Sequence, residues 1–204
     1  MLPHCSRCGA SGARRVCGAC AFTPYCSERC AERDWSTHCE ASDELRIAVT
    51  DHPMDLVYAS PPSLWLGSIA ALDELDVRHI GAVVTVLPMD SPRFDPSWLR
   101  QCVGTQRSHL WLSYHDVPDA PIAECFERAT SWIAAELKAG RSVLVHCHAG
   151  VSRSATIMAA YLLRHHEDRF TSVPAVVAYL KQCRPIVEPN PGFVAQLEGW
   201  CKRE

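Results

Sequence analysis

One short stretch of the sequence, Val145–Ala155 (VHCHAGVSRSA), combines residue types suited to covalent chemistry. Cys147 supplies a thiol, whose deprotonated form is a strong nucleophile, and Arg153 follows after five intervening residues. A planar guanidinium can hold two phosphoryl oxygens at once. Gly150 allows the chain between them to curl so that successive backbone N–H groups face inward and form a cradle for an anion. The pattern predicts attack by a thiolate on a phosphate monoester, giving a thiophosphate intermediate that water hydrolyses.

Neighbouring residues are expected to bind the phosphate or to assist its transfer. Ser154 is placed to donate a hydrogen bond to the Cys147 sulfur when that sulfur becomes the leaving group. We expect the phosphate to be bound by the loop residues His148, Ala149, Gly150, Val151 and Ser152 together with Arg153.

The chain around this loop alternates short apolar runs with helical patterns, which is typical of an α/β fold. The apolar runs are residues 64–67, 82–87, 109–113 and 142–146, and the expected helices are 124–139, 153–164, 173–183 and 190–201. The run that ends at His146 delivers Cys147 to the carboxyl edge of the sheet, and a helix begins next, near Arg153. Ligands of such sheets bind in the crevice at that edge, and the positive end of the helix favours an anion there.

The Cys-x5-Arg spacing in this context resembles the protein tyrosine phosphatase superfamily, and the text HCHAGVSRSAT is similar to its dual-specificity branch. Supporting segments are Ser63–Gly67, Arg184-Pro185, Pro189–Phe193 and Gln196-Leu197, so that the resemblance covers about residues 58–202. It implies a central, mostly parallel sheet flanked by helices. It also implies that His146 orients the loop, and that Asn190 braces the loop or caps the last helix.

Phosphate monoester hydrolysis also needs a general acid, because an alkoxide leaves poorly without a proton. In the dual-specificity branch this acid is an aspartate on a loop about 30 residues before the cysteine, and the segment 115–121 (HDVPDAP) offers Asp116 and Asp119. Asp116 lies ten residues before Phe126 of the following helix, which is the usual offset in the family. The resemblance therefore favours Asp116, with Asp119 as the alternative.

A second group of residues suggests metal binding at the start of the chain. Seven of the 12 cysteines fall in the first 39 residues, six of them in closely spaced pairs. The potential ligands are Cys5, Cys8, Cys17, Cys20, Cys26, Cys30, His38 and Cys39. Eight thiol or imidazole groups suffice for two tetrahedral zinc sites, and the segment has too little apolar area to fold without them.

The order of these pairs resembles a MYND-type zinc finger over residues 5 to about 42. The resemblance implies one ion held by Cys5, Cys8, Cys26 and Cys30, and a second held by Cys17, Cys20, His38 and a final cysteine. The family pattern would place that cysteine at position 42, which is Ser42 here, so Cys39 either serves from an altered turn or the second site has three ligands. Fingers of this type imply contact with proteins, often with proline-rich peptides.

The length and the net charge of the chain limit its possible domain organisation and partners. With 204 residues, 48% of them hydrophobic, the chain can build one core and a small accessory module; we expect a finger at 1–42, a linker at 43–57 and a phosphatase domain at 58–204. A net charge of −3 gives no basic field for nucleic acid or an anionic membrane. Unpaired later cysteines and the absence of an apolar leader predict a cytoplasmic or nuclear protein that is not secreted.

The loop also bears on the substrate. Apart from Arg153, its residues offer at most one partial charge, at His148, whereas phosphatases of inositol lipids carry extra lysines there. The sequence therefore favours a phosphoprotein substrate. Two alternatives remain open: a catalytically weak phosphate-binding adaptor, and a phosphatase of a lipid, an RNA 5′ end or a glycan.

Overall fold

The computed structural model describes residues 15–16, 24–25, 52–90 and 95–201. Near the N-terminus, β1 (Arg15–Val16) and β2 (Pro24–Tyr25) pair antiparallel. The other described strands form one five-stranded sheet. In spatial order these strands are β3 (Met54–Tyr58), β4 (Leu64–Gly67), β7 (Ser142–His146), β5 (Ile80–Val86) and β6 (Ser108–Leu112).

Four strands of this sheet run parallel, and only the edge strand β3 pairs antiparallel with its neighbour β4. The predicted class, a mostly parallel sheet flanked by helices, is confirmed. Strands β7 and β5 lie in the middle and are buried along nearly their whole length. Their continuous apolar runs follow from this position, because helices cover both faces of a parallel sheet.

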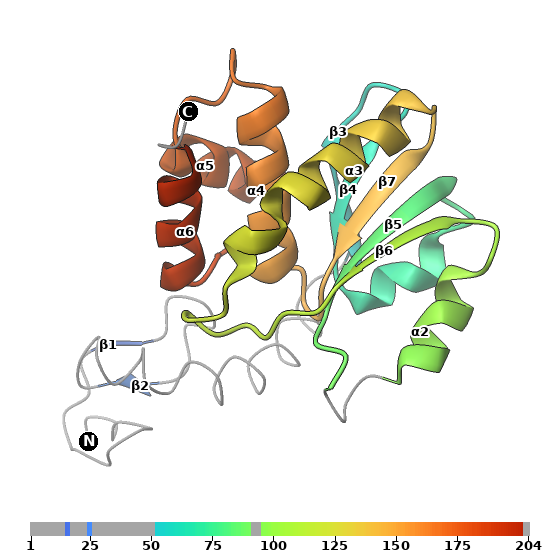
Figure 1. Ribbon diagram of the computed structural model, residues 1–204, viewed down its shortest axis with the longest axis horizontal. Helices are drawn as coiled ribbons and strands as arrows, with labels where there is room; N and C mark the ends of the chain where they lie inside the picture. Colours follow the sequence, from blue (N-terminus) through green and yellow to red (C-terminus); the bar gives the residue numbers. More distant parts are fainter. Residues whose placement is uncertain (1–14, 17–23, 26–51, 91–94, 202–204) are drawn as a thin grey trace.

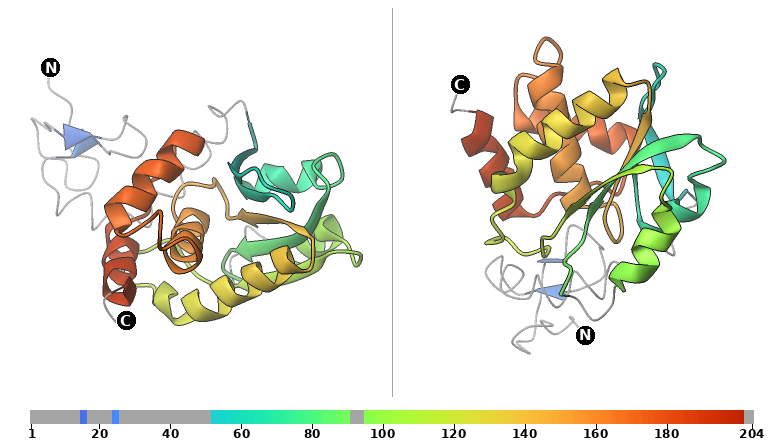
Figure 2. Two further views of the ribbon diagram at one scale, coloured as in Figure 1. Left: turned by 90° about the horizontal axis from the view of Figure 1, so that it is seen from above. Right: turned by 45° about the vertical axis from the view of Figure 1, so that its right-hand side comes forward.

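Helices flank the sheet on both sides (Figures 1 and 2). One side carries α3 (Phe126–Lys138), α4 (Arg153–His165), α5 (Val173–Cys183) and α6 (Pro191–Cys201). The other side carries the 3-10 helix η1 (Ile69–Glu74) and the helix α2 (Pro96–Val103). A short 3-10 helix, η2 (Ile122–Cys125), leads directly into α3.

Helix α4 is the centre of the helical layer, and every residue from Arg153 to Leu163 is buried. It packs against β7, α3, α5 and α6. This accounts for a sequence that is apolar on nearly all sides, as expected for a helix enclosed by other elements. Of the helices that the structure describes, none is long and apolar enough to cross a membrane.

Two elements differ from the expectation. Strand β3 begins at Met54, so the sheet includes the end of the segment 43–57 that the sequence suggested as a linker. Only Met54 and Val57 of this strand are buried, and a register irregularity between Leu56 and Tyr58 breaks the alternation. Helix α2 was not predicted, since only Leu99 and Val103 in its eight residues are buried.

Candidate active site

Cys147 directly follows β7 and lies at the carboxyl edge of the parallel strands, just before α4. Its side chain is 1% exposed. The backbone N–H of Gly150 donates to the Cys147 Sγ at 3.3 Å, and the Ser154 hydroxyl donates to it at 3.1 Å. The sulfur is therefore buried and accepts two hydrogen bonds from the loop and from the start of α4.

The loop 147–152 turns its carbonyl groups away from the sulfur. Each of the six carbonyl oxygens accepts a hydrogen bond: Cys147 from His146 Nδ1, His148 from Ile69 N, Ala149 from Arg184 Nη2, Gly150 from Arg184 Nε, Val151 from Glu188 N, and Ser152 from Thr156 N. In a trans peptide the N–H points opposite to the preceding carbonyl. The N–H groups of residues 148–153 thus face the interior of the loop and form a nest for an anion.

Gly150 permits this curl. Its φ is +72°, and a Cβ at this position would lie 2.6 Å from the carbonyl oxygen of Gly67 and 2.9 Å from Arg184 Nε. A larger residue would be strained in its backbone and would also collide with the last residue of β4. The loop is therefore closely packed on its outer side as well as curled on its inner side.

Arg184, immediately after α5, supplies two of the six donors and is 1% exposed. Its guanidinium also pairs with Asp55 on β3, with Nη1 2.6 Å from Oδ2, and donates to the carbonyl oxygen of His52. Arginine can do this because its five N–H donors form a planar fork. One buried side chain therefore links the phosphate-binding loop to the first strand of the sheet.

Behind the loop, His146 takes part in a buried chain of hydrogen bonds. Its Nδ1 lies 3.2 Å from the Cys147 carbonyl oxygen, and its Nε2 lies 2.8 Å from Thr85 Oγ1. Thr85 Oγ1 is in turn 2.9 Å from His109 Nε2. With both rings neutral, one arrangement satisfies every bond: His109 donates to Thr85, Thr85 donates to His146, and His146 donates to the Cys147 carbonyl.

The pKa of His146 is lowered to about 4, mainly by burial, and His109 and Arg153 contribute in the same direction. Burial and Arg100 also lower the pKa of His109. Because both rings favour the neutral form at neutral pH, the direction of the hydrogen-bond chain is fixed there. This is the arrangement in which His146 can orient the loop.

Asp116 lies against the loop, and Asp119 does not. The side chain of Asp116 is 8% exposed. Its Oδ1 accepts hydrogen bonds from the Ser152 hydroxyl at 2.7 Å and from Asn190 Nδ2 at 2.8 Å, and its Oδ2 is 3.4 Å from Arg153 Nε. Asp119 is exposed. Of the two aspartates, only Asp116 has hydrogen bonds and an ion pair that join it to this loop and to Arg153.

Asn190 has both of the roles that the resemblance left open. Its Oδ1 accepts from the N–H of Phe193 at 3.0 Å, which caps α6, and its Nδ2 donates to Asp116. Its own N–H donates to the Ser152 hydroxyl at 3.1 Å. The start of α6 is thereby joined both to the phosphate-binding loop and to the aspartate.

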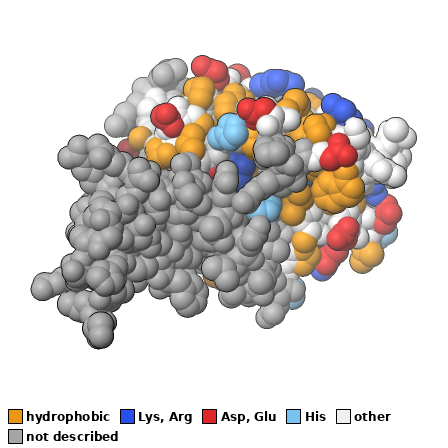
Figure 3. Space-filling view, turned by 90° about the horizontal axis from the view of Figure 1, so that it is seen from below, with side chains coloured by type: hydrophobic (Ala, Val, Ile, Leu, Met, Phe, Trp, Pro, Cys, Tyr) orange, Lys and Arg blue, Asp and Glu red, His pale blue; other side chains and the backbone are white. Residues whose placement is uncertain are grey.

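The loops after the parallel strands gather at the lower end of the molecule in Figure 1, and Figure 3 shows that end face on. Among the coloured side chains, hydrophobic groups are interspersed with acidic, basic and histidine side chains, and neither sign of charge dominates.

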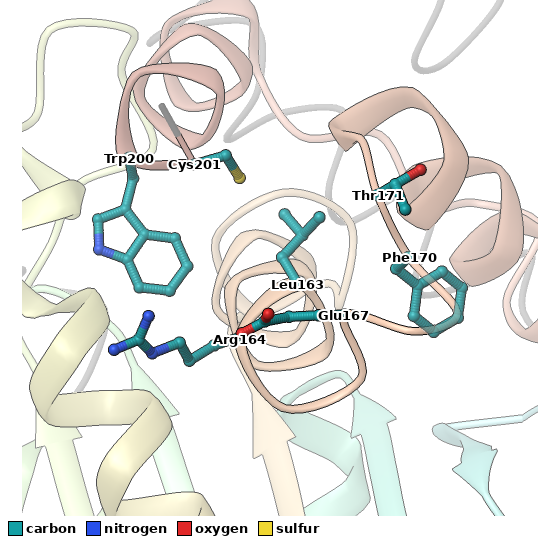
Figure 4. Close-up of a pocket in the computed structure, with 7 residues that line it drawn as sticks. All are labelled: Leu163, Arg164, Glu167, Phe170, Thr171, Trp200 and Cys201. Carbon is teal, nitrogen blue, oxygen red and sulfur yellow. The ribbon is translucent and has the colours of Figure 1, made fainter. Parts of the chain in front are cut away.

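A separate cavity of about 290 Å³ lies between the ends of α4 and α6 (Figure 4). It is lined by Leu163, Arg164, Glu167, Phe170, Thr171, Trp200 and Cys201. Cys147 precedes the opposite end of α4, so this cavity is not the site of the thiol chemistry.

The zinc ligands expected from the sequence, Cys5, Cys8, Cys17, Cys20, Cys26, Cys30, His38 and Cys39, lie outside the described residues. Thiolate and imidazole are the donors that structural zinc prefers, so the donor set fits that metal. The choice between Cys39 and a three-ligand second site stays open.

The fold and the loop together define the architecture of the protein tyrosine phosphatase superfamily: a thiol in a nest of amide groups, between a central parallel strand and the helix that follows it. A family model described as "dual specificity phosphatase, catalytic domain" matches residues 64–203, and a MYND finger model matches residues 5–41. The chain belongs to the dual specificity phosphatase family. The MYND match implies that residues 5–41 bind zinc.

Curated relatives agree with this assignment. Dual specificity protein phosphatase 5 of Homo sapiens is 34% identical over 139 residues, which are 67% of this chain and 33% of that protein. Dual specificity protein phosphatase 19 of Mus musculus is 34% identical over 151 residues, which are 73% of this chain and 64% of that protein. The chain therefore matches about a third of the length of the first of these relatives.

Solved structures show the same fold. The human tyrosine phosphatase-like serine/threonine/tyrosine-interacting protein superimposes with a TM-score of 0.63 at 27% identity, covering 72% of this chain and 94% of that one. Human DUSP28 superimposes with a TM-score of 0.61 at 27% identity, covering 76% and 96%.

Several residues that build the site were not assigned a role from sequence. They are Thr85, His109 and Arg184, which act behind the loop, and Gln196 and Gly192, which contact the segment carrying Asp116. The motifs around Arg184, Gly192 and Gln196 were noted as part of the resemblance. The signal for Thr85 was a polar residue inside the apolar run 82–87, since such a residue needs a hydrogen-bond partner when buried.

Proposed function

We propose that this protein hydrolyses phosphotyrosine and phosphoserine or phosphothreonine monoesters in proteins through a cysteinyl-phosphate intermediate. The observation that carries the proposal is the set of contacts at one loop: Gly150 and Ser154 donate hydrogen bonds to the Cys147 sulfur, and Asp116 contacts Ser152 of the same loop and lies beside Arg153. A phosphoryl group bound there would meet a nucleophile, a set of anion donors and an acid.

In the first step the Cys147 sulfur attacks phosphorus, and the bond from phosphorus to the ester oxygen breaks. A proton from Asp116 passes to that oxygen, so the product leaves as an alcohol or phenol. In the second step water attacks the phosphorus of the cysteinyl phosphate and gives its proton to the Asp116 carboxylate. The sulfur–phosphorus bond breaks, and the electron pair returns to a sulfur that accepts a hydrogen bond from Ser154.

The contacts of Asp116 favour one of its oxygens as the proton carrier. Oδ1 already accepts two hydrogen bonds, from Ser152 and Asn190. Oδ2 faces Arg153 at 3.4 Å, and a bound phosphoryl group competes with it for that guanidinium. Binding of substrate would therefore release Oδ2 from the cation, and we propose Oδ2 as the oxygen that transfers the proton.

Two features support a protein substrate. The loop residues His148, Ala149, Val151 and Ser152 carry no lysine to meet additional phosphates of an inositol ring. The MYND finger is a protein-interaction module, and we propose that it holds two zinc ions and recruits a partner, with a proline-rich peptide as the favoured ligand. A cysteine nucleophile needs a reducing compartment, so we place the protein in the cytoplasm or nucleus.

The test compares hydrolysis of a small aryl phosphate by the wild type, Cys147→Ser, Asp116→Asn and Asp119→Asn. Cys147→Ser should be inactive, and Asp116→Asn should lower kcat by about 10²–10⁴-fold and remove the pH dependence due to the acid. Asp119→Asn is the matched control, because Asp119 is exposed, and it should leave kcat unchanged.

If folded wild type is as inactive as Cys147→Ser, the phosphatase proposal is wrong and the phosphate-binding adaptor takes its place. If aryl phosphate is hydrolysed but phosphopeptides are poorer substrates than inositol lipids, RNA 5′ phosphates or phosphoglycans, the substrate class is wrong while the chemistry stands.

A further inference from the structure

The segment that carries Asp116 is fastened to α6, although the two are about 75 residues apart in the chain. Besides the bond from Asn190 to Asp116, the Gln196 side chain makes two hydrogen bonds to this segment. Gln196 Nε2 donates to the carbonyl oxygen of Ala120 at 2.9 Å, and Gln196 Oε1 accepts from the N–H of Ala123 at 3.0 Å. The amide group of Gln196 therefore binds two points, Ala120 and Ala123, on the stretch of chain between Asp116 and α3.

Gly192, in the first turn of α6, lies directly against the same segment. A Cβ on Gly192 would lie 2.5 Å from the carbonyl carbon of Pro118 and would overlap the carbonyl oxygen. Its φ is not in the left-handed region, in contrast to Gly150, so glycine is not needed here for backbone conformation. It is needed for space, because the neighbour is backbone and cannot rotate away.

The segment itself has little regular structure to hold its position. Residues 113–121 contain no helix or strand, and the internal bonds are short-range, such as Ala120 N to the Val117 carbonyl oxygen. Its contacts with α6 at Pro118, Ala120 and Ala123 therefore add to the hydrogen bonds that hold Asp116 itself.

We propose that the first half of α6 is a docking platform for the segment 116–123, in which Gly192 and Gln196 are positioning residues for the acid. Their contacts are with Pro118, Ala120 and Ala123 rather than with the sulfur, and they act by holding the segment against α6. This inference rests on the proposed function, because it gives Asp116 the role of acid. Its consequence is that changes at Gly192 should affect proton donation more than phosphate binding.

The dependence of kcat on the leaving group separates an effect on proton donation from an effect on phosphate binding. A dinitrophenyl phosphate has a leaving group that needs little protonation, whereas phenyl phosphate needs the acid. Gly192→Ala should lower kcat for phenyl phosphate by about 10²-fold, the scale expected for a misplacement near 1 Å, and should change kcat for the dinitrophenyl ester far less. The affinity for inorganic phosphate should stay the same, because the loop around Cys147 is unchanged.

Gly199→Ala is the matched control on the same helix. A Cβ at Gly199 would meet no atom within 4 Å, so this variant has the same chemical change without the collision and should retain wild-type kinetics on both esters. Gln196→Ala provides a second variant without added bulk, in case Gly192→Ala fails to fold. It should show the same selectivity for the poor leaving group, with a smaller loss.

Hydrogen exchange of the Ala123 amide gives a readout that does not require activity. The amide donates to Gln196, so Gly192→Ala and Gln196→Ala should exchange it faster than wild type, and Gly199→Ala should not. Equal loss of rate on both esters, or unchanged exchange at Ala123, would overturn the docking proposal. If wild type hydrolyses neither ester, the proposed function fails, while the exchange rates still decide whether α6 holds the segment.

Discussion

Replacing Arg184 with methionine should show that the phosphate-binding loop depends on a residue outside it. The variant Arg184→Met keeps an unbranched apolar side chain at a position that is 1% exposed. It removes the donors to the carbonyl oxygens of Ala149 and Gly150, at 3.0 and 3.1 Å, and the ion pair with Asp55.

The free energy of unfolding should fall by about 2–6 kcal/mol from the two carbonyl groups and by a further contribution from the ion pair. Two carbonyl groups left buried without a donor cost about 1–3 kcal/mol each. Loss of the ion pair adds less than the roughly 3–5 kcal/mol of a fully buried pair, because 22% of the Asp55 side chain is exposed and water can reach it. The sum is a large part of the roughly 5–15 kcal/mol that stabilises a typical domain.

Urea unfolding measures the stability, and competition by inorganic vanadate measures the loop. Freed from Arg184, the Ala149 and Gly150 carbonyls can turn inward toward a bound oxyanion, so vanadate should bind at least about tenfold more weakly, equivalent to about 1.4 kcal/mol. Asp55→Asn is the control: it keeps an acceptor for the guanidinium and leaves the Arg184 donors to both carbonyls in place, so it should cost less stability than Arg184→Met and retain vanadate affinity.

The reasoning is refuted if Arg184→Met unfolds within about 1 kcal/mol of wild type and binds vanadate equally well. Should Arg184→Met fail to fold, Arg184→Lys gives the same comparison with a smaller loss, since an ammonium group cannot reach both carbonyls in the geometry of a fork.

Three further predictions concern the buried hydrogen-bond chain and the finger. Thr85→Val keeps the shape of the side chain but leaves His146 Nε2 buried without a donor, so unfolding in urea should require about 1–3 kcal/mol less. The pKa of His146 is about 4 in the folded protein and near 6.5 in the unfolded chain, so the unfolded chain binds more protons between these two values. The contribution of His146 to the free energy of unfolding should therefore be fully present above about pH 6.5 and should fall by about 3 kcal/mol as the pH drops toward 4. His146→Gln should remove that part of the slope, and an unchanged slope would contradict the assignment. Chelation of zinc should release metal from residues 5–41 and abolish partner binding, while kcat on a small aryl phosphate stays constant; a parallel loss of kcat would show that the finger supports the catalytic domain.

The parts of the fold that could be predicted were those with an unbroken local pattern. The runs 64–67 and 142–146 were predicted at the residues where β4 and β7 begin and end, because both are apolar and sharply bounded. The helix predicted at 173–183 also matches α5, whose Ser172 caps the first turn. Strand β3 was missed because an irregular edge strand with two buried residues has no recognisable period.

In the candidate site, too, the residues that could be predicted were those close to one another in the sequence. Cys147 and Arg153 could be found because the loop that joins them is local in the sequence. The contacts of Asp116 with Asn190, and of Thr85 with His146, join segments 74 and 61 residues apart. No spacing rule connects such pairs, so these contacts could be recognised only in the folded structure. The resemblance could rank Asp116 over Asp119 but could not show that α6 holds it.

The nest of N–H groups is better understood as a product of the whole domain than of the Cys-x5-Arg pattern. Its geometry exists because all six carbonyls of the loop are directed outward, and their donors come from β7, η1, the residue after α5, the segment before α6, and α4. A loop of the same sequence without these donors would have to expose or rotate its carbonyls, since buried backbone acceptors need partners. Substitutions at donors far from the sulfur, Arg184 above all, should therefore behave in kinetics like substitutions in the active site itself.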